Sequence, residues 1–279
     1  MKLLRFGNKD NEKPGIEIEG KRFDCSEHFK DWNHNFFQNE GISKLKEIVA
    51  TKTLHQIDNS IRLGSPIARP GMIMCIGLNY SDHAKEAGLE IPKEPILFMK
   101  ATNTLSGPND AVVIPPKSTK TDWEVELGIV INKDCYQLKN EAEGEQHIAG
   151  YTVVHDVSER EFQIERQGQW VKGKSCPGFS PVGPYLVLKE AINDVLNLNM
   201  TLSVNGKTMQ NGNTKFMIFK PDYIVYYLSQ FMQLEAGDLI STGTPPGVGL
   251  GFKPPIYLKR GDEVIIEIEG IGVQRQKFK

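Results

Sequence analysis

Residues 121–132, TDWEVELGIVIN, alternate acidic and apolar side chains in a pattern typical of a strand. Successive side chains of a strand point to opposite faces, so Asp122, Glu124 and Glu126 share one predicted face. The opposite face carries the apolar residues Trp123, Val125, Leu127, Ile129 and Ile131. Because β-branched and aromatic residues favour strands over helices, we expect a strand with one core face and an acidic end.

The acidic face has two interpretations. Buried carboxylates are costly unless they pair with cations or bind a metal, and this favours a metal site on Glu124 and Glu126. A strand face in contact with water would carry the same residues, since antiparallel sheets often keep one face solvated. The alternation alone therefore leaves a metal site and a solvated face open.

Composition excludes several functional classes. The chain has 279 residues, 39% hydrophobic and 24% charged, enough for a sizeable core in one large domain or two. Its net charge of -2 and pI near 6.3 argue against a nucleic-acid-binding surface, which needs a local excess of Lys and Arg. No apolar run reaches the length of a membrane span, and the charged N-terminus does not resemble a signal peptide, so we expect a cytoplasmic protein. The four dispersed cysteines predict neither a disulfide framework nor a zinc site.

Pro and Gly residues divide the chain into two predicted domains. The connector RLGSPIARPG separates a small α+β domain, residues 1–70, from a larger domain, residues 71–279. In the small domain we expect strands at 2–6, 16–18 and 22–25 and helices at 26–37 and 43–50. In the larger domain strands outnumber helices without regular alternation, which favours a mixed α/β, mainly β architecture.

A short predicted helix, residues 81–87, carries a candidate general base. His83 and Glu86 lie three residues apart and so share one helix face, where a carboxylate can fix the imidazole tautomer and raise its basicity. A surface ion pair has the same spacing, and both interpretations stay open. The following segment GLEIPKEP, residues 88–95, has the composition of a closing lid or of an ordinary surface loop.

Two further segments contribute candidate ligand-binding residues. Asp156 ends a predicted strand at 151–156, just before a helix expected at 158–167 from the capping-box spacing of Ser158 and Glu161. The loop TGTPPGVG lacks the ending of a P-loop, and we expect its glycines, Gly243 among them, to let backbone amides and the Thr244 hydroxyl face a ligand.

Taken in order, GLNYSDHAKE, SGPNDAVVIP, DWEVELGIVI, GYTVVHDVSERE, WVKGKS and STGTPPGVG resemble the fumarylacetoacetate hydrolase family. The resemblance covers the whole chain, since MKLLRFG and the small N-terminal domain also resemble the bacterial subgroup labelled 2,4-diketo-3-deoxy-L-fuconate hydrolase or ureidoglycolate lyase. It implies a mixed β-roll catalytic domain, a homodimer and a divalent metal, Mg²⁺ or Mn²⁺. No nucleic-acid or membrane partner is expected.

The resemblance assigns a role to each matching position. It implies that Glu124, Glu126 and Asp156 bind the metal, which agrees with the preference of hard cations for oxygen ligands. His83 with Glu86 matches a water-activating dyad, and Lys174 matches a lysine that holds the substrate or its developing oxyanion. The positions implied to contact substrate are Gln163, Thr244 and, as a weaker candidate, Arg160. Asp122 matches no ligand and is expected behind the ligands or in solvent.

The implied reaction is hydrolysis of a carbon–carbon bond in a 2,4-diketo acid. The expected substrate is 2,4-diketo-3-deoxy-L-fuconate, because Leu78 replaces an Arg found in some acylpyruvate-cleaving members. Its cleavage would give pyruvate and lactate. Alternative activities are those of an acylpyruvase, an oxaloacetate decarboxylase or a ureidoglycolate lyase. A non-catalytic β-domain that binds a metal or ligand would need the acids alone.

Overall fold

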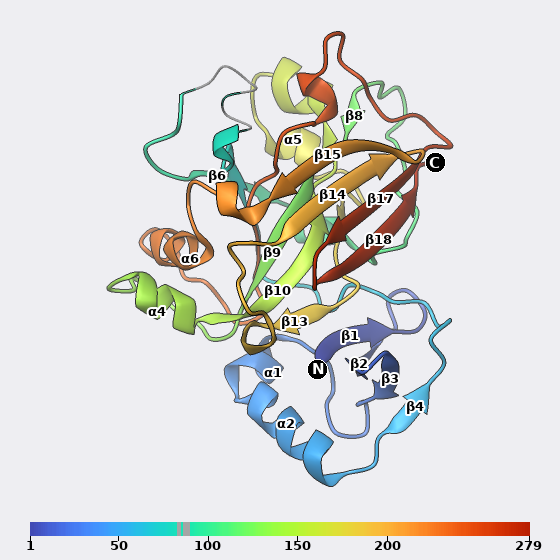
Figure 1. Cartoon of the computed structure of the whole chain (residues 1–279), viewed down its shortest axis with the longest axis vertical. Helices are drawn as coiled ribbons and strands as arrows, with labels where there is room; N and C mark the ends of the chain where they lie inside the picture. Colours follow the sequence, from blue (N-terminus) through green and yellow to red (C-terminus); the bar gives the residue numbers. More distant parts are fainter. Residues whose placement is uncertain (83–84, 86–89) are drawn as a thin grey trace.

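A computed structural model describes residues 1–82, residue 85 and residues 90–279 (Figure 1). Its largest sheet has ten strands in the order β4-β3-β2-β1-β13-β10-β9-β16-β5-β6. Strands are the main regular element of the described chain, and the predicted mixed α/β, mainly β fold is confirmed.

One end of the large sheet is built from the N-terminal region. It comprises β1 (Lys2–Phe6), β2 (Lys13–Ile18), β3 (Lys21–Asp24) and β4 (His55–Ile57), with helices α1 (His34–Gln38) and α2 (Gly41–Thr51). Strands from before and after residue 70 share this sheet, because β1 pairs antiparallel with β13 (Leu186–Leu188). The helix predicted at 26–37 is wrong over most of its length, since Asn33 caps the chain with its side-chain oxygen and the helix begins at His34.

The centre of the large sheet is buried on both faces. It contains β5 (Ile73–Gly77), β9 (Val125–Ile131), β10 (Ile148–His155) and β16 (Leu239–Ser241), whereas β6 (Ile96–Lys100) forms the partly exposed edge beyond β5. Every residue of β9 and β10 is buried, so the solvated face considered for the acidic segment is wrong. Leu127 and Ile129 belong to one core cluster and Val130 to another, because each face of the sheet is covered by other elements.

A second sheet packs across β9 and β10 (Figure 1). Its order is β15-β14-β17-β18, formed by β14 (Asn199–Val204), β15 (Lys207–Asn213), β17 (Glu263–Ile268) and β18 (Gly272–Lys277). Helices α4 (Glu141–Gln146) and α6 (Pro221–Ser229) lie together beside the sheets. Gly144 permits this close approach, because a Cβ there would lie 2.3 Å from the carbonyl oxygen of Asp222.

The remaining elements are short. They are β7 (Leu105–Ser106), β8 (Thr121–Asp122), β11 (Ser158–Glu159), β12 (Ser180–Pro181), α5 (Val171–Lys174), a π-helix (Glu161–Glu165) and 3₁₀ turns at Thr102–Thr104, Lys189–Ala191, Thr214–Phe216 and Gly249–Gly251. The strand predicted at 121–132 is interrupted at Trp123 and Glu124. Before the interruption β8 pairs with β11, and after it β9 pairs with β10.

The helix predicted at 158–167 is also wrong in its start. Ser158 and Glu159 pair with β8 as β11, and the Ser158 hydroxyl donates to the carbonyl oxygen of Asp156 instead of capping a helix. Pairing with a distant strand therefore overrides the local capping-box signal. No helix in the described part of the chain has both the length and the apolar content needed to cross a membrane.

Candidate active site

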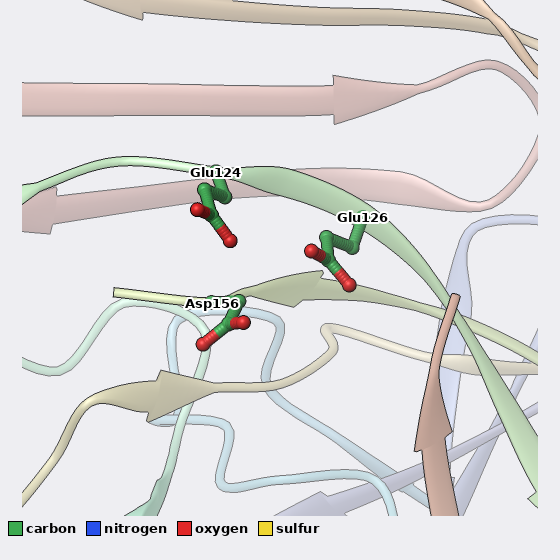
Figure 2. A group of neighbouring side chains, drawn as sticks. All are labelled: Glu124, Glu126 and Asp156. Carbon is green, nitrogen blue, oxygen red and sulfur yellow. The ribbon is translucent and has the colours of Figure 1, made fainter. Parts of the chain in front are cut away.

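Three buried carboxylates meet where β9 and β10 lie side by side (Figure 2). Glu124 directly precedes β9, Glu126 lies within it, and Asp156 follows the last residue of β10. The Asp156 amide donates to the Glu124 carbonyl oxygen at 3.0 Å, which fixes the two backbones next to each other. One carboxylate oxygen from each residue lies within 4.8 Å of the others. The structure thus brings together the three residues predicted as metal ligands.

The donor set fits a hard divalent cation. Three carboxylates supply only oxygen ligands, which suit Mg²⁺ or Mn²⁺. Glu126 Oε2 accepts hydrogen bonds from Ser241 Oγ at 2.5 Å and from the Gly243 amide at 2.9 Å. Its other oxygen accepts none from the described residues, and Glu126 lines a cavity. Burial, with Asp156 and Glu124 nearby, holds the pKa of Glu126 well above its ordinary value, so a cation beside it would relieve an unfavourable cluster of negative charge.

Two buried lysines contact this cluster. Lys174 Nζ lies 2.7 Å from Glu124 Oε2 and 2.6 Å from Asp156 Oδ2. Burial lowers the pKa of Lys174, but the two carboxylates outweigh burial and hold that pKa above its ordinary value. Lys100, at the end of β6, pairs with the other oxygen of Asp156 and donates to the carbonyl oxygens of Val157 and Phe179.

Lys100 was not among the predicted site residues. A charged residue that ends the apolar strand ILFMK was the available signal, although the sequence does not show which distant carboxylate it reaches. Lys100 contacts Asp156 Oδ1 and Lys174 contacts Oδ2, so each oxygen of this carboxylate has its own lysine.

Arg160 holds the acidic cluster from a third direction. Its guanidinium donates to Asp122 Oδ2 at 2.8 Å, to Glu124 Oε1 at 2.7 Å and to Gln163 Oε1 at 2.9 Å. Burial raises the pKa of Glu124, but Lys174 and Arg160 outweigh burial and lower that pKa below its ordinary range. Asp122 is fully buried and also accepts from the amides of Gly249 and Leu250, so its expected alternative position in solvent is wrong.

The loop after β16 contacts the acidic cluster through the Gly243 amide, which was expected to face a ligand. The Gly243 amide donates to Glu126 and is therefore occupied within the protein, and Gly243 does not line the cavity. Its φ of 99° is one that glycine readily adopts. Thr244 does line the cavity, while its hydroxyl donates to the Val125 carbonyl oxygen and accepts from Gln210.

A cavity of about 540 Å³ opens beside the acids. Its polar lining comprises Glu124, Glu126, Arg160, Gln163, Lys174, Thr244 and Lys253. Its other described lining residues are Ile76, Gly77, Leu78, Ile96, Phe98, Ile164, Trp170, Val248, Leu250 and Gly251. The predicted dyad of His83 and Glu86, and the start of the predicted lid, lie outside the described residues.

The family assignment rests on a direct match. Residues 72–279 match the family described as fumarylacetoacetate (FAA) hydrolase C-terminal, which is more than half of the chain. The chain belongs to the fumarylacetoacetate hydrolase family. This match confirms the resemblance noted in the motifs and includes all the residues discussed for the site.

Relatives of this family member span its whole length. A protein of Burkholderia multivorans, named only as a hydrolase, is 48% identical over 99% of this chain and 98% of its own. The fumarylacetoacetate hydrolase of Exiguobacterium antarcticum has a TM-score of 0.85 at 32% identity, covering 100% of this chain and 99% of that one. Maleylpyruvate hydrolase of Sphingobium sp. SYK-6, solved with manganese(II) and pyruvate, has a TM-score of 0.80 at 26% identity, covering 100% and 98%. The family member described here is therefore an enzyme of hydrolase type.

Proposed function

We propose that this enzyme is a divalent-metal-dependent hydrolase that cleaves a carbon–carbon bond of a 2,4-diketo acid and releases pyruvate. The proposal rests mainly on the cluster of Glu124, Glu126, Asp156 and Lys174, in which Glu124, Glu126 and Lys174 also line the cavity. A structural relative binds manganese(II) and pyruvate, and this supports the same choice of metal and product here.

Glu124, Glu126 and Asp156 would hold Mg²⁺ or Mn²⁺ through their carboxylate oxygens. The bound metal would supply Lewis acidity toward the oxygens of the diketo acid and so stabilise negative charge that develops in the leaving pyruvoyl group. Arg160 and Lys100 hold Glu124 and Asp156 in place, because each donates to one of their oxygens. Such contacts orient the carboxylate ligands.

The proposed reaction consumes one water. The water oxygen forms a bond to the C4 carbonyl carbon, the bond between C3 and C4 breaks, and its electron pair passes to C3. Protonation at C3 completes pyruvate, and C4 leaves as the carboxyl group of the second product. His83, assisted by Glu86, is proposed to take the proton from the attacking water, a role taken from the family pattern.

Lys174 is proposed to stabilise the oxyanion or the substrate. Its ammonium group is buried, is held by two carboxylates, and lines the cavity. A preorganised positive group in a site of low dielectric constant stabilises developing negative charge without rearrangement. Gln163, Thr244 and Arg160 also line the cavity and are proposed to contact substrate, although Arg160 already serves Asp122 and Glu124.

The identity of the second product depends on the substrate beyond C4. 2,4-Diketo-3-deoxy-L-fuconate gives lactate, and acylpyruvates give simple carboxylic acids. Oxaloacetate decarboxylation would use the same stabilisation of a pyruvate enolate. Leu78, which suggested the fuconate derivative, lines the cavity, whereas the other apolar lining residues, Phe98 and Trp170 among them, favour an acylpyruvase as the second candidate.

A lactate-dehydrogenase-coupled assay of pyruvate release tests this proposal. The panel contains 2,4-diketo acids, acylpyruvates and oxaloacetate, each with Mg²⁺, Mn²⁺ or a chelator, and ureidoglycolate with a glyoxylate assay. We expect metal-dependent pyruvate release from the diketo acids. Glyoxylate release alone, or full turnover after thorough chelation, would exclude the proposed reaction.

His83→Ala should lower kcat by about 10²- to 10⁴-fold, and unchanged turnover would remove the general-base role. A homodimer is also proposed, and sedimentation velocity measures it directly.

A further inference from the structure

The lining of the cavity beside the acids is of two chemical kinds. Its charged members are Glu124, Glu126, Arg160, Lys174 and Lys253. Most of its large apolar side chains form what we call the apolar wall, whose six members are Ile76, Ile96, Phe98, Ile164, Trp170 and Leu250. A ligand that fills the whole cavity must therefore combine a charged end with an apolar end.

The apolar wall begins directly beside Lys174. Lys174 Nζ lies 5.0 Å from the centre of the Phe98 ring, and that ring lies 5.2 Å from the Trp170 ring in an edge-to-face arrangement. A group attached to a substrate that reacts next to Lys174 would meet Phe98 first and Trp170 next.

Gly77 fixes the position of the Trp170 ring. A Cβ at residue 77 would lie 3.0 Å from Trp170 Cζ3 and 3.3 Å from Cη2, so the ring packs on a backbone without a side chain. Trp170 immediately precedes α5, which carries Lys174. Trp170 and the proposed catalytic lysine consequently belong to one short segment of the chain, which packs on β5 at Gly77.

Several wall residues are unusually exposed for their type. Ile96, Ile164 and Leu250 are 37%, 48% and 38% exposed, although all three are large and aliphatic. Exposed apolar side chains gathered around one cavity are a common sign of a surface that a ligand covers. Burying them against hydrocarbon would release water from both surfaces.

The wall has little capacity for hydrogen bonds. The indole N–H of Trp170 is the only polar side-chain group among its six members. The hydroxyl of Thr244 is already bonded to Val125 and Gln210, and Lys253 is an exposed lining residue. A substrate hydroxyl that lies against the aliphatic and aromatic carbons of the wall, out of reach of the Trp170 N–H, would thus lose water without gaining an equivalent partner.

On the basis of the proposed function, we infer that the apolar wall binds the carbon chain beyond C4, and that Trp170 makes the enzyme prefer a hydrocarbon chain to one with a hydroxyl group at C5. The preferred substrates are then acylpyruvates with a short alkyl or alkenyl chain. The fuconate derivative carries a hydroxyl at C5 and would be a poorer substrate.

A matched pair of substrates tests this preference. 2,4-Dioxohexanoate and its 5-hydroxy derivative, which is 2,4-diketo-3-deoxy-L-fuconate, differ by a single hydroxyl group. We expect kcat/KM to be higher for 2,4-dioxohexanoate by up to about 100-fold, the usual limit for rejecting one hydroxyl in an apolar pocket. Along acetyl-, propionyl- and butyrylpyruvate we expect kcat/KM to rise by about fourfold per methylene.

Variants at Trp170 assign the effect. Trp170→Ala should flatten the rise of kcat/KM with chain length and reduce discrimination against the hydroxyl, whereas Trp170→Phe should retain most of both. Phe231→Ala removes an aromatic ring that is 61% exposed and absent from the cavity lining, and it should retain both fully. Mn²⁺ affinity measured by calorimetry should be equal in all four proteins, which shows that the acidic cluster is intact.

The outcomes separate this inference from the proposed function. If no diketo acid releases pyruvate, the proposed function fails. If pyruvate is released but kcat/KM is independent of chain length, or is higher for the hydroxylated substrate, the proposed function stands and the inference is overturned. An unchanged chain-length dependence in Trp170→Ala would likewise overturn the role of Trp170.

Discussion

Lys174 Nζ lies 2.6 Å from Asp156 Oδ2 in a fully buried ion pair. Lys174 ends α5 and Asp156 follows β10, so the pair joins an irregular segment to the central sheet. Since Lys174 also reaches Glu124, one ammonium group contacts two of the three residues proposed to bind the metal. This arrangement places Lys174 beside the proposed metal ligands, where its ammonium group would also lie close to the carbonyl of the proposed substrate.

Replacing Lys174 should separate metal binding from catalysis. Lys174→Met keeps an unbranched apolar stem and removes the charge that stabilises the oxyanion, so kcat should fall by about 10²- to 10³-fold. Metal affinity should stay equal or rise, because a positive group beside the same carboxylates has been removed. Steady-state kinetics and Mn²⁺ calorimetry measure the two effects. Loss of metal binding in parallel with kcat would instead assign Lys174 a structural role.

Removing the charge of Glu126 should weaken metal binding directly. Glu126→Gln keeps the side-chain shape but replaces an anionic ligand, and we expect Mn²⁺ affinity to fall by at least about 100-fold, more than loss of an outer contact usually costs. Glu267→Gln is the matched control, because Glu267 is an exposed residue of β17 in the second sheet. Equal Mn²⁺ affinity in the two variants would contradict the proposed ligand set.

The contact between Asp122 and Arg160 should matter for stability more than surface ion pairs do. Asp122→Ala leaves the buried guanidinium of Arg160 without one of its carboxylates and should cost about 3–5 kcal/mol in the free energy of unfolding. Arg166→Ala removes an exposed pair with Glu161 and should cost about 0–1 kcal/mol. Urea denaturation measures both values, and similar costs would show that the Asp122 pair has no special role.

The ion pair of Asp110 with Arg62 predicts a pH-dependent contribution to stability. Burial raises the pKa of Asp110, but bonds from Arg62 and the Gly107 amide outweigh burial, and the pKa lies below its ordinary 3.8. A carboxyl group with a lowered pKa in the folded state stabilises the fold above pH 3.8 and loses this contribution as pH falls.

Asp110→Asn should therefore destabilise the protein by about 1–2 kcal/mol at neutral pH. The difference from the natural sequence should shrink as the pH falls below 3.8. Free energies of unfolding, measured over a pH series with Glu267→Gln as the control, test the sign. A difference that is constant at all pH values, or that grows in acid, would refute it.

The central strands and the acidic cluster could be predicted because their signal is local. Alternation placed Glu124 and Glu126 on one face, and Asp156 stood at the end of a β-rich segment. The family resemblance implied that these three residues act together. The pairing of β9 with β10, seen in the register of Glu126 with Val154, brings them together.

Other features depend on contacts between distant residues. Lys100 reaches Asp156 across 56 positions, and Arg160 reaches Asp122 across 38, so no short pattern reveals either pair. At Ser158 a clear local pattern was misleading. The capping-box spacing predicted the start of a helix, but the segment pairs with β8 as a strand. The start of helix α4 is marked by nearby residues in the sequence. The Asn140 side chain accepts a hydrogen bond from the Glu143 amide, and the Glu143 side chain accepts one from the Lys139 amide.

The most direct measurement is pyruvate release from 2,4-dioxohexanoate by metal-stripped enzyme, before and after Mn²⁺ is restored. Glu126→Gln is measured in parallel at the same Mn²⁺ concentration. We expect no release above background without metal, recovery on adding Mn²⁺, and little recovery in the variant. Full activity of the metal-stripped enzyme, or equal recovery in Glu126→Gln, would contradict metal-dependent cleavage at the acidic cluster.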